Sequence, residues 1–214
     1  MLIDTDYQLI GSVPLHVISG LQKLASTLDW TTTEFDRNDP YLNTRIVRVP
    51  YNVRIEPSQE LTHNVSSVLT EFEPVDQWIH LQYPEHTFIK CEIACLLPGD
   101  KLKFHVDSRW WHQHSHRIHV PITSNPDCFW CVEDREHYLK VGEYYEINNR
   151  RYHSYCNRGA TPRLHLIFDI ISNKKYQAAL TEGIDIGSKT FETLFLTQEE
   201  FFQVLPELCK DNYF

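Results

Sequence analysis

The chain has 214 residues, a formal net charge of −9, and contents of 42% hydrophobic and 13% aromatic residues. This length suffices for one domain with a substantial core. The apolar content excludes a disordered chain, which could not offset the entropy that is lost on ordering. The acidic balance opposes binding to nucleic acid or to anionic lipid headgroups. We therefore expect a single domain over residues 1–214, with neither nucleic acid nor membrane as a partner.

The N-terminal residues, MLIDTDYQLI, contain two aspartates and lack a basic stretch followed by an apolar one. They therefore do not resemble a secretory signal peptide. No later segment approaches the roughly 18 consecutive apolar residues of a membrane-spanning helix. The expected location is the cytoplasm, where the six cysteines would be reduced thiols.

Residues 13–30 predict an amphipathic helix, because leucine or isoleucine recurs at positions 15, 18, 21, 24 and 28. Ser12 is the expected N-cap, and Pro14 fits the first turn. We expect this helix to pack on the outside of a sheet.

From about residue 45 to residue 171 the pattern changes to short apolar or alternating runs separated by turn residues. The turns are PGD, TSNPD, KVGE, NNRR and NRGATP, with no helical spacer between the runs. Such a pattern favours an antiparallel sandwich or barrel. The tail, residues 174–214, returns to helical composition, with Thr197 and Glu200 as a capping box. The predicted strands are RIVRVPY, FIKCEIACLL, KLKFHV, HRIHVPI, CFWCVE, YYEIN and RLHLIFDII.

Cys128 and Cys131 form the motif CFWC in one of these extended runs. Positions three apart in a strand face opposite sides of the sheet, so the two thiols are poorly placed to share a metal ion. A single CxxC motif without a second matching pair is weak evidence for structural zinc. We expect buried, reduced thiols at both positions.

The segment PGDKLKFHVD reads as a turn followed by a strand, in which His105 and Asp107 face the same side. Alone, this pair could be a buried ion pair. His153, in RRYHSYCNRG ahead of the last predicted strand, is a candidate third ligand. Two histidines and one carboxylate with open positions are the ligand set of non-haem Fe(II) oxygenases. Ten residues beyond His153, Arg163 could clamp a carboxylate with both arms of its guanidinium group.

This ordered set resembles the Fe(II)/2-oxoglutarate-dependent dioxygenases. More closely, PGDKLKFH, HRIHVPI and RYHSYCNRGATPRLHLIFDI resemble the aspartyl/asparaginyl β-hydroxylase family, including its proline-hydroxylating relatives, over about residues 89–171. The fold implied by the resemblance is mainly β, a double-stranded β-helix of the jelly-roll or cupin type. With the predicted helices it would carry flanking N- and C-terminal helices.

The resemblance implies His105 and His153 as iron ligands and Arg163 as the clamp for the distal carboxylate of 2-oxoglutarate. It also implies Arg117 and His119, in HRIHV, as further contacts to that co-substrate.

Asp107 departs from the animal, protein-directed members of the family, which have glycine at this position. It matches the proline-hydroxylating branch, in which the aspartate is present. Asp107 therefore strengthens the assignment of a metal site and weakens any transfer of the animal enzymes' protein substrate.

Four further histidines lie close to these positions. His112, His114 and His116, in WWHQHSH, are expected in a loop near the mouth of the site. This loop either closes over substrate or is solvated without a role in binding. His165 shares the strand face of Arg163 and is expected to be a hydrogen-bonded core histidine.

The sequence thus predicts an Fe(II)- and 2-oxoglutarate-dependent dioxygenase that hydroxylates a C–H bond and releases succinate and CO₂. Its expected partners are O₂ and a small-molecule or peptidyl amino acid, meaning a free amino acid such as proline or aspartate, or an Asp or Asn side chain. Two alternatives remain open. One is a non-catalytic sensor that binds metal and 2-oxoglutarate, and the other is a cupin-like metalloenzyme that does not use 2-oxoglutarate.

Overall fold

The structure of the protein, a computed structural model, describes residues 3–28, 45–48, 72–107, 112, 114–174 and 203. In chain order its elements are β1 (Tyr7–Ser12), α1 (Leu15–Thr27), β2 (Arg45–Arg48), α2 (Glu73–Gln82), β3 (His86–Leu96), β4 (His116–Thr123), β5 (Cys128–Val132), β6 (Arg135–His137), β7 (Glu143–Ile147), β8 (His153–Asn157) and β9 (Arg163–Ser172).

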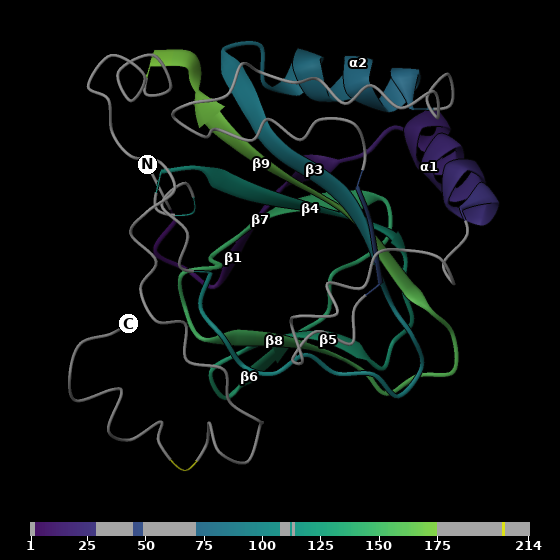
Figure 1. Ribbon diagram of the computed structural model, residues 1–214, viewed down its shortest axis with the longest axis vertical. Coiled ribbons are helices and arrows are strands. Elements are labelled where there is room, and N and C mark those ends of the chain that lie inside the picture. Colours follow the sequence, from purple (N-terminus) through teal and green to yellow (C-terminus); the bar gives the residue numbers. More distant parts are fainter. Residues whose placement is uncertain are drawn as a thin grey trace.

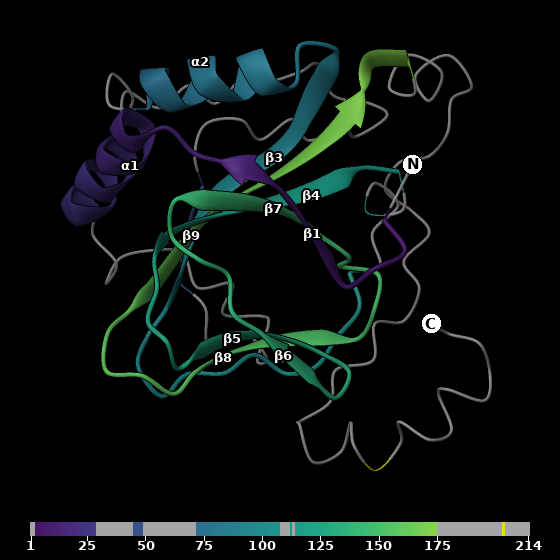
Figure 2. The same ribbon diagram turned by 180° about the vertical axis from the view of Figure 1, so that it is seen from behind.

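The strands form two antiparallel sheets that face each other (Figures 1 and 2). The major sheet has the order β1-β7-β4-β9-β3-β2, and the minor sheet has the order β6-β5-β8. Between β3 and β4 the chain adds two isolated bridges to β8, Lys101 with Cys156 and His105 with His153. From β3 onward the chain therefore passes repeatedly from one sheet to the other, as in a double-stranded β-helix. The predicted fold class is confirmed.

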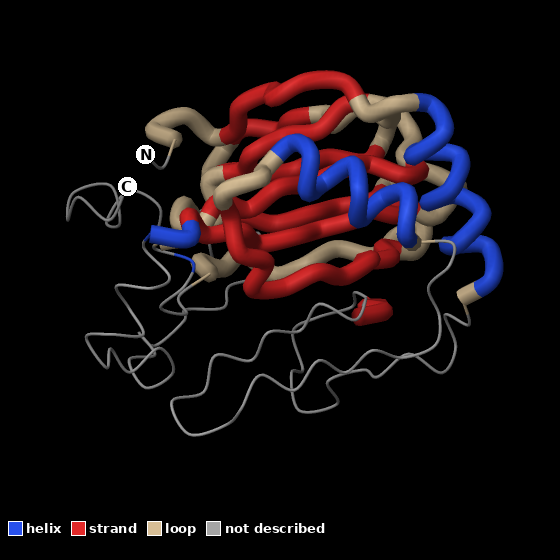
Figure 3. Tube along the Cα trace, turned by 90° about the horizontal axis from the view of Figure 1, so that it is seen from above, coloured by secondary structure: helices blue, strands red, loops and turns tan. Residues whose placement is uncertain are grey.

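Helices α1 and α2 lie together over the outer face of the major sheet (Figures 1 and 3). The space between them and the sheet is filled by a buried apolar cluster, and Gln22 Nε2 donates a hydrogen bond to the carbonyl of Ile122 at 3.1 Å. This arrangement confirms the expected packing of the first helix. The cluster includes Leu21 from α1, Ile79 from α2, Val120 from β4 and Phe168 from β9.

The start of α1 differs from the prediction. The N-cap residue is Pro14, without a side-chain capping bond, and the expected cap Ser12 is the last residue of β1. The strand continues to this point because Ser12 pairs with Glu143 of β7. Local capping preference is therefore overridden by pairing in the sheet.

Helix α2 was not predicted, because this part of the chain was expected to contain strands only. Its buried residues Val75, Trp78 and Ile79 have helical spacing, and a proline lies in its first turn. The expected C-terminal helices, with Thr197 and Glu200, lie outside the described residues apart from Lys174 and Gln203. None of the described helices is long and apolar enough to span a bilayer.

The predicted strands coincide with β2, β3, β4, β5, β7 and β9, while KLKFHV forms isolated bridges only. Three further strands, β1, β6 and β8, lie in segments that the sequence pattern did not single out. Strand β8 is buried throughout, so it shows no alternation of apolar and polar residues. Strand β6 has only three residues, which is too short for a periodic pattern.

Alternate residues of the major sheet point into the space between the sheets. Along β9, Leu166 and Phe168 belong to the cluster beneath the helices, whereas Arg163, His165 and Asp169 take the opposite face. The interior of the β-helix therefore contains charged and polar groups that are buried between the two sheets.

Candidate metal centre and co-substrate pocket

His105, Asp107 and His153 meet where the segment after β3 runs beside β8. The backbone N–H of His105 donates to the carbonyl of His153 at 3.0 Å, and the reverse bond measures 2.9 Å. The two imidazole centroids are 4.4 Å apart, and His105 Nε2 lies 3.7 Å from Asp107 Oδ1. One ligand atom from each residue lies within 4.8 Å of the other two. The three side chains therefore lie close enough to share a single metal ion.

Both imidazole rings are oriented by backbone carbonyls. His105 Nδ1 donates to the carbonyl of Lys103, and His153 Nδ1 donates to that of Arg151, each at 2.8 Å. These bonds leave Nε2 of each ring as the nitrogen with a lone pair for a metal. Burial, followed by the nearby His105, lowers the pKa of His153 to about 3. His153 is therefore neutral, which is the form in which histidine binds a metal.

Asp107 is oriented by two donors on its other oxygen. Arg117 Nη1 donates to Oδ2, as does Asn149 Nδ2 at 3.0 Å. Oδ1 is thereby left on the side of His105. Burial alone raises the pKa of Asp107, but Arg117 and then the neighbouring histidines outweigh it and hold the pKa well below its usual value. The carboxylate is therefore ionised and able to bind a cation.

Arg117 is itself held by Asp169, which lies opposite it in the pairing of β4 with β9. Its Nε donates to Oδ1 and its Nη2 to Oδ2 of Asp169, each at 2.7 Å. The Asp169 side chain is completely buried. The resemblance implies Arg117 as a contact to 2-oxoglutarate, whereas its partners in the structure are Asp169 and Asp107. In the structure Arg117 fixes the orientation of the Asp107 carboxylate.

Sequence reasoning did not identify Asp169 or Asn149. For Asp169 a signal existed in the sequence. RLHLIFDII is an apolar strand, and an acidic residue that faces the interior of such a strand requires a buried partner of opposite charge. Asn149 lies in a turn, NNRR, whose composition gives no indication that its side chain reaches Asp107.

His112 and His116 differ from the expected loop. The His112 side chain is 7% exposed, and its Nε2 lies 3.0 Å from Arg117 Nη2 and 3.8 Å from Asp169 Oδ2. Burial lowers the pKa of His112 to about 4. His116 is the first residue of β4, with its Nδ1 2.7 Å from Glu146 Oε1. The solvated-loop alternative is therefore wrong for these two histidines, while Trp110 and Trp111 lie outside the described residues.

Arg163 occupies the interior at the start of β9 and is 2% exposed. Its Cζ lies 4.1 Å from the centroid of the Tyr155 ring, and its Nη2 donates to His165 Nδ1 at 2.7 Å. Its Nε has no hydrogen-bond partner, and no acidic side chain forms an ion pair with it within the described parts of the chain. A buried guanidinium of this kind is costly unless an anion binds it. The site therefore fits the carboxylate of a bound molecule.

His119 and His165 line the wall beside Arg163. The Tyr155 hydroxyl is hydrogen-bonded to His119 Nδ1 at 3.0 Å, and the Nδ1 atoms of the two histidines are 3.3 Å apart. Burial, followed by the positive charge of Arg163, holds the pKa of both imidazoles well below the usual value. Both rings are therefore neutral. The expectation of a hydrogen-bonded, buried His165 is confirmed.

A row of aromatic contacts joins the Arg163 pocket to the metal ligands. The Trp130 ring centroid lies 4.5 Å from that of His153 and 4.7 Å from that of Tyr155. His153 and Tyr155 are two residues apart on one face of β8, which corresponds to about 7 Å. Arg163, over the ring of Tyr155, and the imidazole of His153 therefore lie near neighbouring positions of the same interior face.

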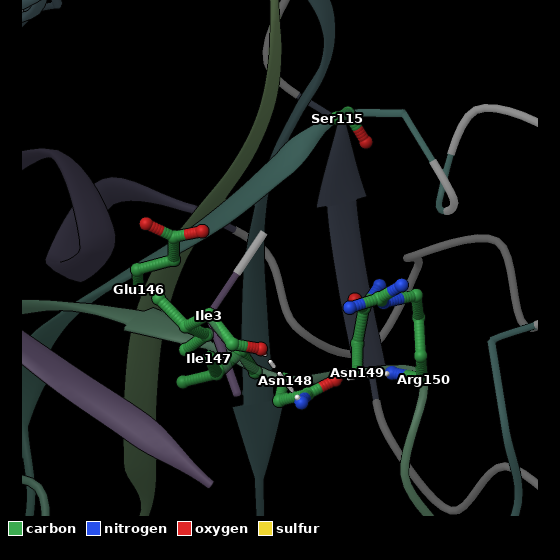
Figure 4. Close-up of a pocket in the computed structure, with 7 residues that line it drawn as sticks. All are labelled: Ile3, Ser115, Glu146, Ile147, Asn148, Asn149 and Arg150. Atoms are coloured by element: carbon green, nitrogen blue, oxygen red, sulfur yellow. Dashed lines mark hydrogen bonds between the residues drawn. The ribbon is translucent and has the colours of Figure 1, made fainter. Parts of the chain in front are cut away.

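A shallow polar depression, with room for about one water molecule, adjoins the centre on the side of Asn149 (Figure 4). Figure 4 shows the turn after β7 along one side of it, with the Asn148 amide donating to the Ile3 carbonyl at 3.1 Å. Because Asn149 also contacts Asp107, the depression and the metal centre share a wall. Its lining residues are Ile3, Ser115, Glu146, Ile147, Asn148, Asn149 and Arg150.

The sequence model of the aspartyl/asparaginyl β-hydroxylases matches residues 19–173. No curated protein sequence matches the chain. Three solved structures share the fold. An oxidoreductase of the 2OG-Fe(II) oxygenase family from Burkholderia pseudomallei has 12% identity and a TM-score of 0.53, over 79% of this chain and 86% of that one. HygX from Streptomyces hygroscopicus, with nickel and 2-oxoglutarate bound, has 11% identity and a TM-score of 0.56, over 78% and 83%. A Pseudomonas putida prolyl-4-hydroxylase has 12% identity and a TM-score of 0.52, over 79% and 94%.

Fold and site together define a double-stranded β-helix protein with an interior centre of two histidines and one carboxylate. The chain belongs to the aspartyl/asparaginyl β-hydroxylase family. It is accordingly a hydroxylase of the dioxygenase class, with Fe(II) and 2-oxoglutarate as its cofactors.

Proposed function

We propose that the chain hydroxylates an amino acid, either free or as an Asp or Asn residue of a polypeptide, and releases succinate and CO₂. His105, Asp107 and His153 would hold the iron, and Arg163 would bind the distal carboxylate of 2-oxoglutarate. The bound iron supplies the oxygen chemistry, while the protein sets the geometry and excludes water.

The observation that carries this proposal is the buried Arg163 with its unsatisfied Nε. A carboxylate there would gain two charge-assisted hydrogen bonds and would neutralise a desolvated charge. The neutral His119 and His165 beside it add no charge that would compete for this anion. We retain His119 as a further contact to the co-substrate. A contact between Arg117 and the co-substrate also remains a prediction. Arg117 already forms ion pairs with Asp107 and Asp169, so it would have to bind the co-substrate in addition to these two carboxylates.

An amino-acid substrate is supported by charges near the Arg117 end of the interior. Lys90 lies opposite Asp169 in the pairing of β3 with β9, and Lys90 Nζ is 2.8 Å from Glu92 Oε2. Together with the Arg117–Asp169 pair, Lys90 and Glu92 place positive and negative side chains on the same part of the major sheet. A substrate that carries an ammonium and a carboxylate group would find complementary partners there.

The test is succinate production from 2-oxoglutarate with Fe(II), ascorbate and O₂, together with mass spectrometry for the gain of one oxygen atom. Free amino acids and a peptide library are the substrates. His105→Ala and His153→Ala should each abolish both signals, whereas His80→Ala, on the exposed face of α2, is the matched control and should retain them. Binding of metal and 2-oxoglutarate without succinate formation under any condition would instead support a sensor.

A further inference from the structure

A second group of metal-binding side chains lies on the minor sheet, on the face away from the β-helix interior. Trp130 packs inward with Tyr155, whereas Cys131 belongs to a separate cluster with Phe104 and Cys156. Strand alternation places Cys128 on the inward side with Trp130. The two cysteines of CFWC therefore face opposite sides, as the sequence predicted, and Cys131 has a different partner.

That partner is Cys156 on the neighbouring strand β8. The two Sγ atoms are 3.6 Å apart. Two thiolates bound to one zinc ion with Zn–S bonds of about 2.3 Å and a tetrahedral angle would lie about 3.8 Å apart. A disulfide requires an S–S separation of about 2.05 Å, so the pair would have to move closer by more than an ångström. The observed spacing is nearer to that of a metal-bridged pair.

Glu136 supplies a third ligand group. It lies opposite Cys131 in the pairing of β5 with β6, and its carboxylate and the two sulfur atoms all lie within 4.8 Å of one another. Glu136 is solvent-exposed while both thiols are buried, so a cation can enter from the Glu136 side. Cysteine sulfur and a carboxylate oxygen are both established zinc ligands.

The charges around the cluster also fit a divalent cation. Two thiolates and one carboxylate carry three negative charges, and Arg158 contributes one positive charge. Arg158 Nη1 and Nη2 donate to Oε2 and Oε1 of Glu136, so a cation would take over one of these exposed oxygens from the guanidinium. A divalent cation would bring this group to neutrality. The hydrogen bond between the two thiols lowers the pKa of Cys156 and raises that of Cys131, so the free pair favours a single thiolate at Cys156 and a bound cation would displace the second proton.

We propose that Cys131, Cys156 and Glu136 form a second metal site for a thiophilic divalent cation, with Zn²⁺ as the fitting ion. Its fourth position faces solvent. The site joins β5, β6 and β8, the three strands of the minor sheet, one of which carries His153. Its role is structural, since the ion lies on the opposite face of the sheet from the co-substrate pocket.

The test uses the full chain, reduced and anaerobic, titrated with Cd²⁺ as the probe and followed by the ultraviolet thiolate-to-cadmium charge-transfer band. The His105–Asp107–His153 centre contains no sulfur and cannot produce this band, so failure of this proposal is distinguishable from failure of the proposed function. We expect one saturable band that persists in His153→Ala. Competition by Zn²⁺ should remove the band.

Cys131→Ser and Cys156→Ser should each lose the band. Cys128→Ser is the matched control, because it changes a thiol of the same strand on the opposite face, and it should keep the band. Glu136→Gln alters only an exposed side chain and leaves both thiols in place. It should weaken Cd²⁺ binding roughly tenfold, since even the outer partners of metal ligands are worth ten- to a hundredfold in affinity.

Circular dichroism of each variant would show whether the fold is retained. Absence of a band at stoichiometric Cd²⁺, a band that survives Cys131→Ser, or unchanged affinity in Glu136→Gln would overturn the proposal. The first of these outcomes would indicate that the two thiols form only a hydrogen-bonded or redox-active pair.

Discussion

Arg163→Lys tests the co-substrate pocket most directly, because it retains the positive charge and removes the planar fork. The wild-type guanidinium lies over Tyr155 and donates to His165 at 2.7 Å, while its buried Nε has no hydrogen-bond partner. A lysine ammonium at this position can approach one carboxylate oxygen, but it cannot donate two parallel bonds.

The magnitude follows from the lost hydrogen bond. A hydrogen bond to a charged group contributes about 1.5–3 kcal/mol, and a tenfold change in affinity corresponds to about 1.4 kcal/mol. Losing one arm of the fork should therefore weaken 2-oxoglutarate binding roughly 10- to 150-fold. Fe(II) affinity should be nearly unchanged, because none of the recorded contacts of Arg163 involves His105, Asp107 or His153.

The assay is an anaerobic titration of wild type and variant, first with Fe(II) and then with 2-oxoglutarate, followed by the charge-transfer absorbance of the ternary complex. Thermal unfolding without ligands serves as a control for the fold. Equal affinities of the two proteins for 2-oxoglutarate would refute the assignment of Arg163. A parallel loss of Fe(II) affinity would show that the substitution disturbs the whole interior.

Three further predictions concern the interior charges. Asp107→Gly should abolish turnover and reduce metal affinity severely, because the nearby carboxylate of Asp169 is already bound by Arg117; full activity would show that two histidines suffice. Asp169→Asn should cost about 3 kcal/mol in urea unfolding, the lower end for breaking a buried ion pair, and should weaken Mn²⁺ binding about tenfold. Unchanged metal affinity would separate the Arg117–Asp169 pair from the metal centre. The metal-free protein should lose stability as the pH falls below about 6.5, because the lowered pKa values of His119 and His165 mean that only the unfolded chain takes up these protons. The loss is at most about 1.4 kcal/mol per pH unit for each histidine, and equal urea midpoints at about pH 7.5 and pH 5.5 would contradict it.

The sequence alone predicted the alternation of strands and turns and nominated His105, Asp107 and His153, which the structure brings together. The strand pattern and the HxD spacing are local signals, whereas His153 was nominated by the ordered resemblance. Residues two apart in an extended segment face the same side, so the HxD spacing brought His105 and Asp107 together although their segment forms only isolated bridges. Six of the predicted runs coincide with strands because their apolar spacing matches the pleat. The ordered set of HxD, His153 and Arg163 was sufficient to indicate the family that the comparison confirms.

Other features were invisible in the sequence because they depend on which strands become neighbours. Ser12 has the composition of a helix cap, yet its pairing with Glu143 keeps it in β1. Helix α2 was missed because its short apolar stripe precedes a long series of strands.

The register of β4 against β9 decides that Arg117 meets Asp169, residues 52 positions apart in the chain, and thereby changes the observed role of Arg117. The pairing of β5 with β8 likewise brings Cys131 to Cys156 rather than to Cys128. Spacing within one strand fixes which face a side chain occupies, but only the tertiary pairing of strands fixes what it meets there, because the partner is chosen by the global fold.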